Sequence, residues 1–222
     1  MRDELVVYTQ PKSRICEAIK VLRTNLYFAS IDEEIKVILV TSSMPGEGKS
    51  FIAANLACAF AAVDKKVLVI DCDLRRGRQH KIFQVENDQG LSNLLINDIK
   101  KYNNYIRKTK INNIGLLPMG IIPPNPGELL SSKKNKDLLE LLKKHYDIII
   151  LDCPPVNGLS DTISLTSIAD TSVVVSAINI TPIETLEQTK KTLEQVNAKV
   201  SGIVVNKIPD GKKNKYYESY YQ

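Results

Sequence analysis

The sequence contains no tryptophan and only four cysteines in 222 residues. These cysteines are far apart, without the Cys-x-x-Cys spacing of zinc or redox motifs: Cys16, Cys58, Cys72 and Cys153. Isolated cysteines of this kind are typical of small buried hydrophobic residues in a reducing compartment. Their spacing therefore excludes a disulfide scaffold and predicts a protein of the cell interior.

No stretch is apolar over the roughly 20 residues that a membrane-spanning helix needs. The longest apolar run, 52–63, is interrupted by Asn55, and no signal peptide opens the chain. We therefore expect a soluble cytoplasmic protein that reaches the inner face of the cell membrane only through a partner. A chain of this length suits one α/β domain with a sizeable core.

A strong excess of one charge sign is also missing, since the formal net charge is +5. The basic residues are scattered, apart from small clusters at 100–110 and 212–215. They do not form the stripe along one face that nucleic-acid binding favours. We therefore expect no nucleic-acid partner.

One strong motif joins a strand to a helix near residue 45. The apolar, β-branched run 37–40 predicts a buried strand, and the Ala-rich segment 51–63 predicts a helix. Between them, residues 42–50 read Ser-Ser-Met-Pro-Gly-Glu-Gly-Lys-Ser, a phosphate-binding loop in which Ser43 replaces the usual first glycine. A glycine turn without chemical meaning is the alternative, but the flanking strand and helix favour nucleotide binding.

The residue types of this loop suit a bound nucleoside triphosphate. Its two glycines let successive backbone N–H groups turn toward phosphate oxygens, and the helix adds its positive dipole end. Lys49 is expected to reach the β- and γ-phosphates, and the Ser50 hydroxyl to ligate Mg²⁺. The predicted nucleotide-binding residues are Pro45, Gly46, Glu47, Gly48, Lys49, Ser50 and Phe51.

Two further apolar strands end in carboxylates. The strand 66–70 runs into Asp71 and Asp73, and the strand 146–151 ends at Asp152. The C-terminal edge of an open parallel sheet faces the ligand, and carboxylates two residues apart there project to the same side. They suit Mg²⁺ or a proton acceptor beside it, whereas a merely polar strand end is the alternative. The phosphate-binding loop at the same edge favours the functional interpretation.

The remaining pattern alternates strands with helices. We expect a helix at 91–96, a strand at 114–118, a helix restarting at 126 and reaching 144, strands at 171–177 and 200–205, and a helix at 182–196 capped by Thr181. This alternation predicts an α/β fold with a P-loop NTPase-like, mostly parallel sheet and helices on both faces. Asn206, which ends the last strand, is either a ligand of the adenine base or a turn former.

The N-terminal segment 13–29 predicts an amphipathic helix. Its apolar residues recur at helical spacing: Ile15, Ala18, Ile19, Leu22 and Leu26. Glu17, Lys20 and Arg23 lie off that stripe. They form either a plain surface row or a contact with a neighbouring subunit, and periodicity alone does not separate the two.

The C-terminal segment 212–222 has a different composition. It contains no aliphatic residue and carries four tyrosines, Tyr216, Tyr217, Tyr220 and Tyr221. A disordered polar tail is the plain interpretation, but such tails are seldom rich in aromatic residues. Tyrosine is also able to accept a phosphoryl group. We expect residues 1–211 to form one domain and 212–222 a flexible tail.

Five stretches carry a resemblance to a known family: 17–26, 42–50, 69–75, 149–155 and the tyrosine-ended tail. Together they resemble the bacterial tyrosine kinases that regulate capsule and exopolysaccharide synthesis, in their free-standing cytoplasmic form. The resemblance implies an ATP- and Mg²⁺-dependent protein-tyrosine kinase that phosphorylates its own tail between subunits. It assigns the phosphates to Lys49, Mg²⁺ to Ser50, Asp73 and Asp152, and the proton of the tyrosine hydroxyl to Asp71.

The resemblance also implies partners. It implies a ring-shaped homo-oligomer in which the helix with Glu17, Lys20 and Arg23 contacts its neighbour. The family often has arginine where this chain has Lys20, and lysine cannot form a bidentate ion pair. The resemblance further implies a transmembrane activator protein with a cytoplasmic tail, and protein substrates of polysaccharide synthesis.

Two other functions remain open at this point. The switch ATPases of septum placement and chromosome partition share the expected fold, but they carry a lysine where this chain has Met44, and they generally lack a tyrosine tail. The third possibility is a scaffold that binds nucleotide without catalysis. The complete set of phosphate-binding lysine, hydroxyl and carboxylates argues against that scaffold.

Overall fold

The computed structural model describes residues 4–29, 34–157 and 160–209. Its strands form one seven-stranded sheet in the order β3-β4-β2-β5-β1-β6-β7. All neighbouring strands are parallel except β3, which pairs antiparallel with β4. The strands are β1 Val37–Ser42, β2 Val67–Asp71, β3 Arg107–Lys108, β4 Ile114–Leu117, β5 Ile148–Asp152, β6 Thr171–Ala177 and β7 Val200–Asn206.

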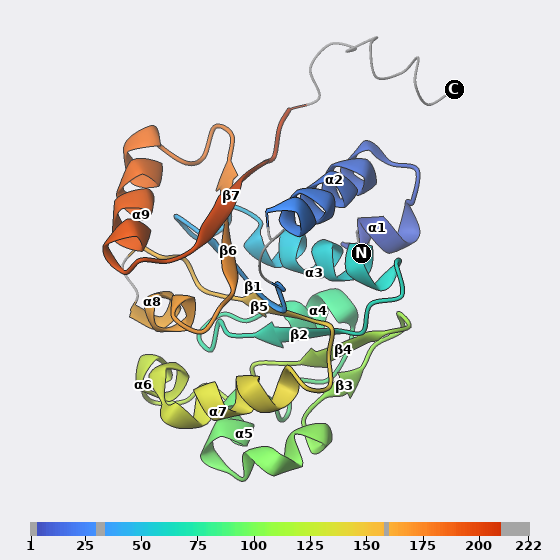
Figure 1. Ribbon diagram of the computed structural model, residues 1–222, viewed down its shortest axis with the longest axis vertical. Coiled ribbons are helices and arrows are strands. Elements are labelled where there is room, and N and C mark those ends of the chain that lie inside the picture. The colour runs from blue at the N-terminus through green and yellow to red at the C-terminus, as the bar shows by residue number, and fades with distance from the viewer. Residues whose placement is uncertain (1–3, 30–33, 158–159, 210–222) are drawn as a thin grey trace.

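Helices cover both faces of the sheet (Figure 1). One face carries α1 Val6–Thr9, α2 Arg14–Phe28, α3 Lys49–Ala61 and α4 Gln79–Phe83. The other face carries α5 Leu91–Ile96, the 3₁₀ helix η1 Ile99–Asn104, α6 Pro126–Ser131, α7 Lys133–Leu142 and α8 Ser160–Thr166. The last helix, α9 Ile183–Gln195, packs through Leu193 against Val174 of β6.

Alternate residues of the central strands supply two separate cores. Ile38 and Val40 of β1 belong to the core under α2 and α3, whereas Val37 and Leu39 belong to the core under α5 to α8. A strand buried on both faces needs apolar residues at every position, which is why it reads as an unbroken apolar run. The predicted fold class is therefore confirmed.

Most predicted elements are present, and two details of the prediction were wrong. Thr181 does not cap the helix predicted at 182–196, because α9 begins at Ile183 after Pro182 and the Thr181 hydroxyl donates to the Glu47 carboxylate instead. On α2, Ile15 and Ala18 are exposed, and the buried residues are Cys16, Ile19 and Leu26. Ile19 and Leu26 of the predicted stripe are buried and Leu22 packs against the same core, so the buried face differs from the prediction only in having Cys16 in place of Ile15 and Ala18.

The segment before residue 11 contains the short helix α1. Asn55, whose side chain is buried in α3, holds α1 against that helix. Its amide donates to the carbonyls of Glu4 and Phe51 at 2.8 and 2.9 Å, and its oxygen accepts from Val7 N at 2.9 Å. A buried amide of this kind is tolerated inside an apolar helix because its donors and acceptor are paired.

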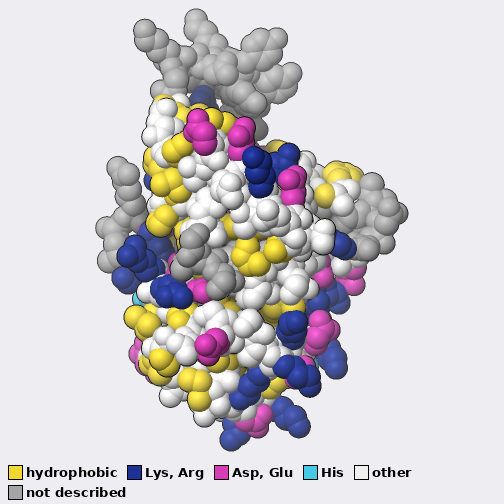
Figure 2. Space-filling view, turned by 90° about the vertical axis from the view of Figure 1, so that its left-hand side faces the viewer, with side chains coloured by type: hydrophobic (Ala, Val, Ile, Leu, Met, Phe, Trp, Pro, Cys, Tyr) yellow, Lys and Arg dark blue, Asp and Glu magenta, His cyan; other side chains and the backbone are white. Residues whose placement is uncertain are grey.

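The surface that carries α6, α8 and α9 mixes side chains of both charges with scattered apolar ones (Figure 2). All four cysteines are free and buried, as their spacing predicted. Within the described ranges, no helix is both long and apolar enough to cross a bilayer. The boundary predicted between a domain ending at 211 and a tail from 212 lies outside the described residues.

Candidate functional site

The phosphate-binding loop lies between β1 and α3, where the sequence predicted it. Gly46 and Gly48 have φ of 84° and 99°, in the left-handed region that favours glycine. A side chain at Gly48 would also collide with the amide of Asn206. Lys49 begins α3 directly after the loop, so the N-terminus of a 13-residue helix faces the space that the loop encloses.

Side chains from other elements hold this loop in shape. The buried Glu47 carboxylate accepts from its own loop, at Met44 N at 2.6 Å, and from the Thr181 hydroxyl. Asn206, at the end of β7, donates to Glu47 O at 2.9 Å, and Lys207 donates to Gly46 O at 2.7 Å. The conformation of the loop therefore depends on residues some 130 to 160 positions further along the chain.

The three predicted carboxylates meet at the C-terminal edge of the sheet. Asp71 and Asp152 lie directly opposite each other in the register of β2 and β5, and both are fully buried. Asp73 follows two residues after Asp71 and is also buried. Their convergence is a consequence of the parallel register, which aligns the ends of neighbouring strands.

The Lys49 ammonium lies among these carboxylates. Its Nζ is 3.0 Å from Asp73 Oδ2 and 3.6 Å from Asp152 Oδ1. Burial alone lowers the pKa of Lys49, but the nearby Asp152 and Asp73 carboxylates outweigh burial and raise it. Lys49 is therefore fully charged at neutral pH, as a group that binds phosphate must be.

For Asp71, burial and a neighbouring like charge change the pKa in the same direction. Burial, followed by repulsion from Asp152, raises the pKa of Asp71 well above its usual value, against the opposing effects of Gln79 N–H and Lys49. A raised pKa makes a carboxylate a stronger proton acceptor. The close packing of Gly77 maintains this burial, since a Cβ there would lie 2.6 Å from Asp71 Oδ2.

Gln79 is a central residue of the site that the sequence analysis missed. Its side-chain amide donates to Asp152 Oδ2 at 2.8 Å and to Ser50 O at 3.0 Å, while its backbone N–H donates to Asp71 Oδ2 at 2.9 Å. It is fully buried at the start of α4. One residue thus links the phosphate-binding loop to both aspartate-ended strands.

The donor set fits a magnesium ion. Two buried carboxylate oxygens, Asp71 Oδ1 and Asp152 Oδ1, have no hydrogen-bond partner among the described residues. Ser50, whose hydroxyl is the expected ligand from the loop, begins α3 beside Lys49. Hard oxygen donors with unused lone pairs, next to a phosphate-binding loop, are what Mg²⁺ requires.

Several predicted site residues are placed elsewhere or are not described. Within this chain, Glu17 pairs with Lys20 at 2.6 Å, and Arg23 donates to Ala59 O at 2.8 Å. Asn206 contacts the loop through its amide, so its contact with a base stays a prediction. The four tail tyrosines lie outside the described residues.

The chain is similar to known proteins along most of its length. Residues 35–205 match the family model described as AAA domain. The putative tyrosine-protein kinase CapB of Staphylococcus aureus is 38% identical over 97% of this chain and 94% of its own.

Two solved structures have a fold similar to that of this chain. The chimerical protein CapA2B2 superposes with a TM-score of 0.90 at 37% identity, covering 95% of this chain and 92% of that one. The kinase domain of the Escherichia coli tyrosine kinase ETK superposes with a TM-score of 0.85 at 31% identity, covering 94% and 83%.

The position of Gln79 generates a prediction. Gln79→Leu nearly keeps the volume but leaves the buried Asp152 Oδ2 without its donor, so we expect the free energy of unfolding to fall by about 1–3 kcal/mol. We also expect the Mg²⁺ concentration for half-maximal activity to rise by about 10- to 100-fold, because Asp152 loses its orientation. Urea unfolding and Mg²⁺ titration measure the two effects. Gln188→Leu, on the exposed side of α9, is the control, and equal Mg²⁺ requirements in both variants would contradict this role.

Proposed function

The chain belongs to the bacterial tyrosine-protein kinases, and we propose that it uses ATP and Mg²⁺ to phosphorylate the tyrosines of its own tail, Tyr216, Tyr217, Tyr220 and Tyr221. The observation that carries the proposal is the cluster of Lys49 with three strand-end aspartates beside a phosphate-binding loop. Protein substrates of polysaccharide synthesis follow from the family resemblance. A switch ATPase is the alternative, which the named kinase relatives do not favour.

Each residue of the site has one role in this proposal. The loop 45–51 binds the phosphates through its backbone N–H groups, and Lys49 leaves its carboxylates to neutralise the transferred phosphoryl group. Ser50, Asp73 and Asp152 would hold Mg²⁺, which when bound neutralises phosphate charge. Asp71 accepts the proton of the tyrosine hydroxyl, and its raised pKa supports that role. Asn206 contacts the adenine base.

The charge of the tail supplies a switch. Unmodified, the tail carries Lys212, Lys213 and Lys215 against Glu218, so it is attracted to the aspartates of the site. Each phosphotyrosine adds a charge of about −1.5 to −2. A fully phosphorylated tail is therefore strongly anionic and leaves the site.

The assembly proposed is a ring in which α2 contacts the next subunit. Exposed apolar side chains on α2 support this interface, since Ile15, Val21 and Phe28 are 48%, 57% and 68% exposed. Glu17, Lys20 and Arg23 would exchange part of their internal contacts for contacts across the ring. A transmembrane activator with a cytoplasmic tail would recruit this cytoplasmic ring to the membrane.

The kinase assignment is tested by mapping phosphotyrosine with mass spectrometry after incubation with Mg-ATP. We expect the wild type to label its tail, and Lys49→Met to lose roughly 10²–10³ in rate because one aimed positive charge is gone. Asp71→Asn should still bind nucleotide but lose transfer. Near wild-type labelling by Asp71→Asn would show that Asp71 is not the proton acceptor, and no labelling by the wild type would reject the function itself.

Transfer between subunits is tested by mixing two variants, neither of which is able to label its own tail. Lys49→Met supplies an intact tail, and an active form with all four tail tyrosines changed to Phe supplies the site. Phosphate on the Lys49→Met chain is the expected result. If the mixture stays unlabelled while the wild type labels itself at high dilution, each chain modifies its own tail.

The ring interface is tested by Glu17→Ala combined with Arg23→Ala. We expect light scattering to report a lower mass. Because Arg23→Ala also removes the bond to Ala59 O, we expect the free energy of unfolding to fall by about 1 kcal/mol. The matched control removes another helical pair, Lys190 and Glu194 of α9, which are 3.6 Å apart. An unchanged mass in the α2 variant would show that Glu17 and Arg23 are ordinary surface residues without a role in assembly.

A further inference from the structure

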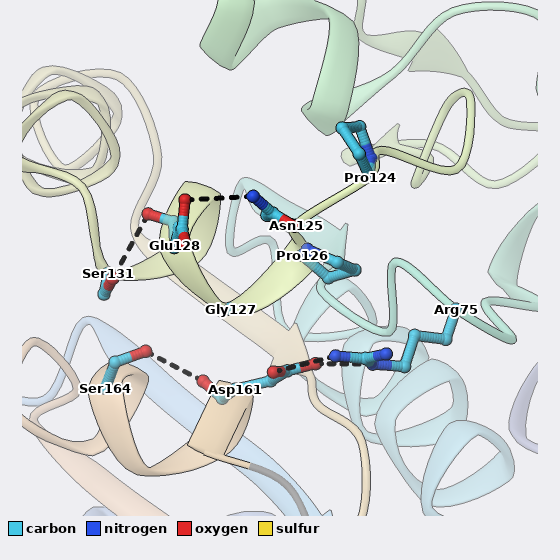
Figure 3. Close-up of a pocket in the computed structure, with 9 residues that line it drawn as sticks. All are labelled: Arg75, Pro124, Asn125, Pro126, Gly127, Glu128, Ser131, Asp161 and Ser164. Atoms are coloured by element: carbon cyan, nitrogen blue, oxygen red, sulfur yellow. Dashed lines mark hydrogen bonds and ion pairs between the residues drawn. The ribbon is translucent and has the colours of Figure 1, made fainter.

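A groove of about 400 Å³ is lined in part by Arg75, which follows Asp73 by two residues, and the proposed chemistry does not use this groove. Figure 3 shows its two sides. One side is the start of α6 with the loop before it, which contributes Pro124, Gly127 and Glu128. The other side is the pair formed by Arg75 and Asp161.

The position of the groove suits the acceptor of a phosphoryl transfer. The strand order β4-β2-β5-β1 fixes the sequence of loops along the C-terminal edge of the sheet. The loop after β4 lines the groove, the aspartates of β2 and β5 come next, and the phosphate-binding loop after β1 is last. Because the attacking and leaving oxygens are roughly in line, an acceptor should approach from the side of the aspartates opposite the phosphate-binding loop.

The charges of the groove favour a basic ligand. Arg75 is its positive residue, but two of its nitrogens already contact the buried Asp161 carboxylate, at 2.9 and 3.4 Å. Glu128 is exposed, and its carboxylate accepts one bond, from Asn125 at 3.2 Å. With Arg75 neutralised by Asp161, Glu128 gives the groove a net negative charge.

The shape of the groove favours an aromatic ring. Pro124 is exposed, and Gly127 has no side chain, so apart from Glu128 this wall carries no long flexible group. A tyrosine ring can lie against such a surface while its hydroxyl points to the polar end. The chain itself offers one matching segment, in which Lys213 and Lys215 precede Tyr216 and Tyr217.

We propose that this groove binds the acceptor segment and selects tyrosines that have basic residues beside them. The Glu128 carboxylate attracts the lysine or arginine next to the tyrosine. The proposal rests on the proposed kinase function and adds its substrate class. The occupant in the assembled protein is the tail of a second copy, and other proteins with lysine or arginine next to tyrosine are substrates of the same kind.

The test measures peptide phosphorylation by the full-length protein. One peptide has the sequence of residues 210–222, and its partner has the three lysines changed to glutamate. We expect the wild type to prefer the basic peptide, and Glu128→Lys to raise KM for it by roughly three- to tenfold, because reversing an exposed charge replaces attraction with repulsion. The effect should fall on KM rather than kcat, be smaller in Glu128→Gln, and shrink at high salt.

A matched variant separates this effect from a general change of surface charge. Glu187→Lys reverses an exposed acid on α9 that does not line the groove. It should leave KM for both peptides unchanged. Glu128→Lys with an unchanged KM, or a wild type that uses both peptides equally, would overturn the docking site while leaving the kinase intact. A wild type that labels neither peptide nor its own tail would instead reject the proposed function.

Discussion

The site depends on two buried aspartates that the sheet forces together. The register of β2 and β5 puts Asp71 directly opposite Asp152, and neither carboxylate is exposed to water. Two like charges in such a place are unfavourable unless cations or hydrogen-bond donors balance them. Lys49 and Gln79 supply that balance, and they lie at the start of α3 and α4 respectively.

The parts of this arrangement that are local in sequence were predictable. The phosphate-binding loop is recognised from glycine, lysine and serine at fixed spacing. The two strands are recognised from apolar runs that end in aspartate. Parallel pairing then brings those ends together without further information. The same logic predicted the sheet, because a strand with no polar face must be covered on both sides.

What the sequence did not reveal are contacts between distant segments. Gln79 begins a helix of five residues, which is too short for any periodicity to mark its side chain as buried. Thr181 looked like a helix cap because its local pattern fits one, yet its hydroxyl is used by Glu47, 134 positions earlier. On α2 the prediction included the exposed Ile15 and Ala18 and missed the buried Cys16. Several apolar side chains of this helix remain exposed, so composition alone did not define its buried face.

The bonds that Thr181, Asn206 and Lys207 make to the phosphate-binding loop have a thermodynamic consequence. A flexible loop must lose conformational entropy when a ligand binds, and that loss weakens affinity. Here the ordering cost is met during folding, by contacts from the end of the chain that are already in place. Coupling of this kind is reciprocal. A ligand that stabilises the loop must therefore also stabilise the end of β7, the edge strand from which the chain continues toward its tyrosines.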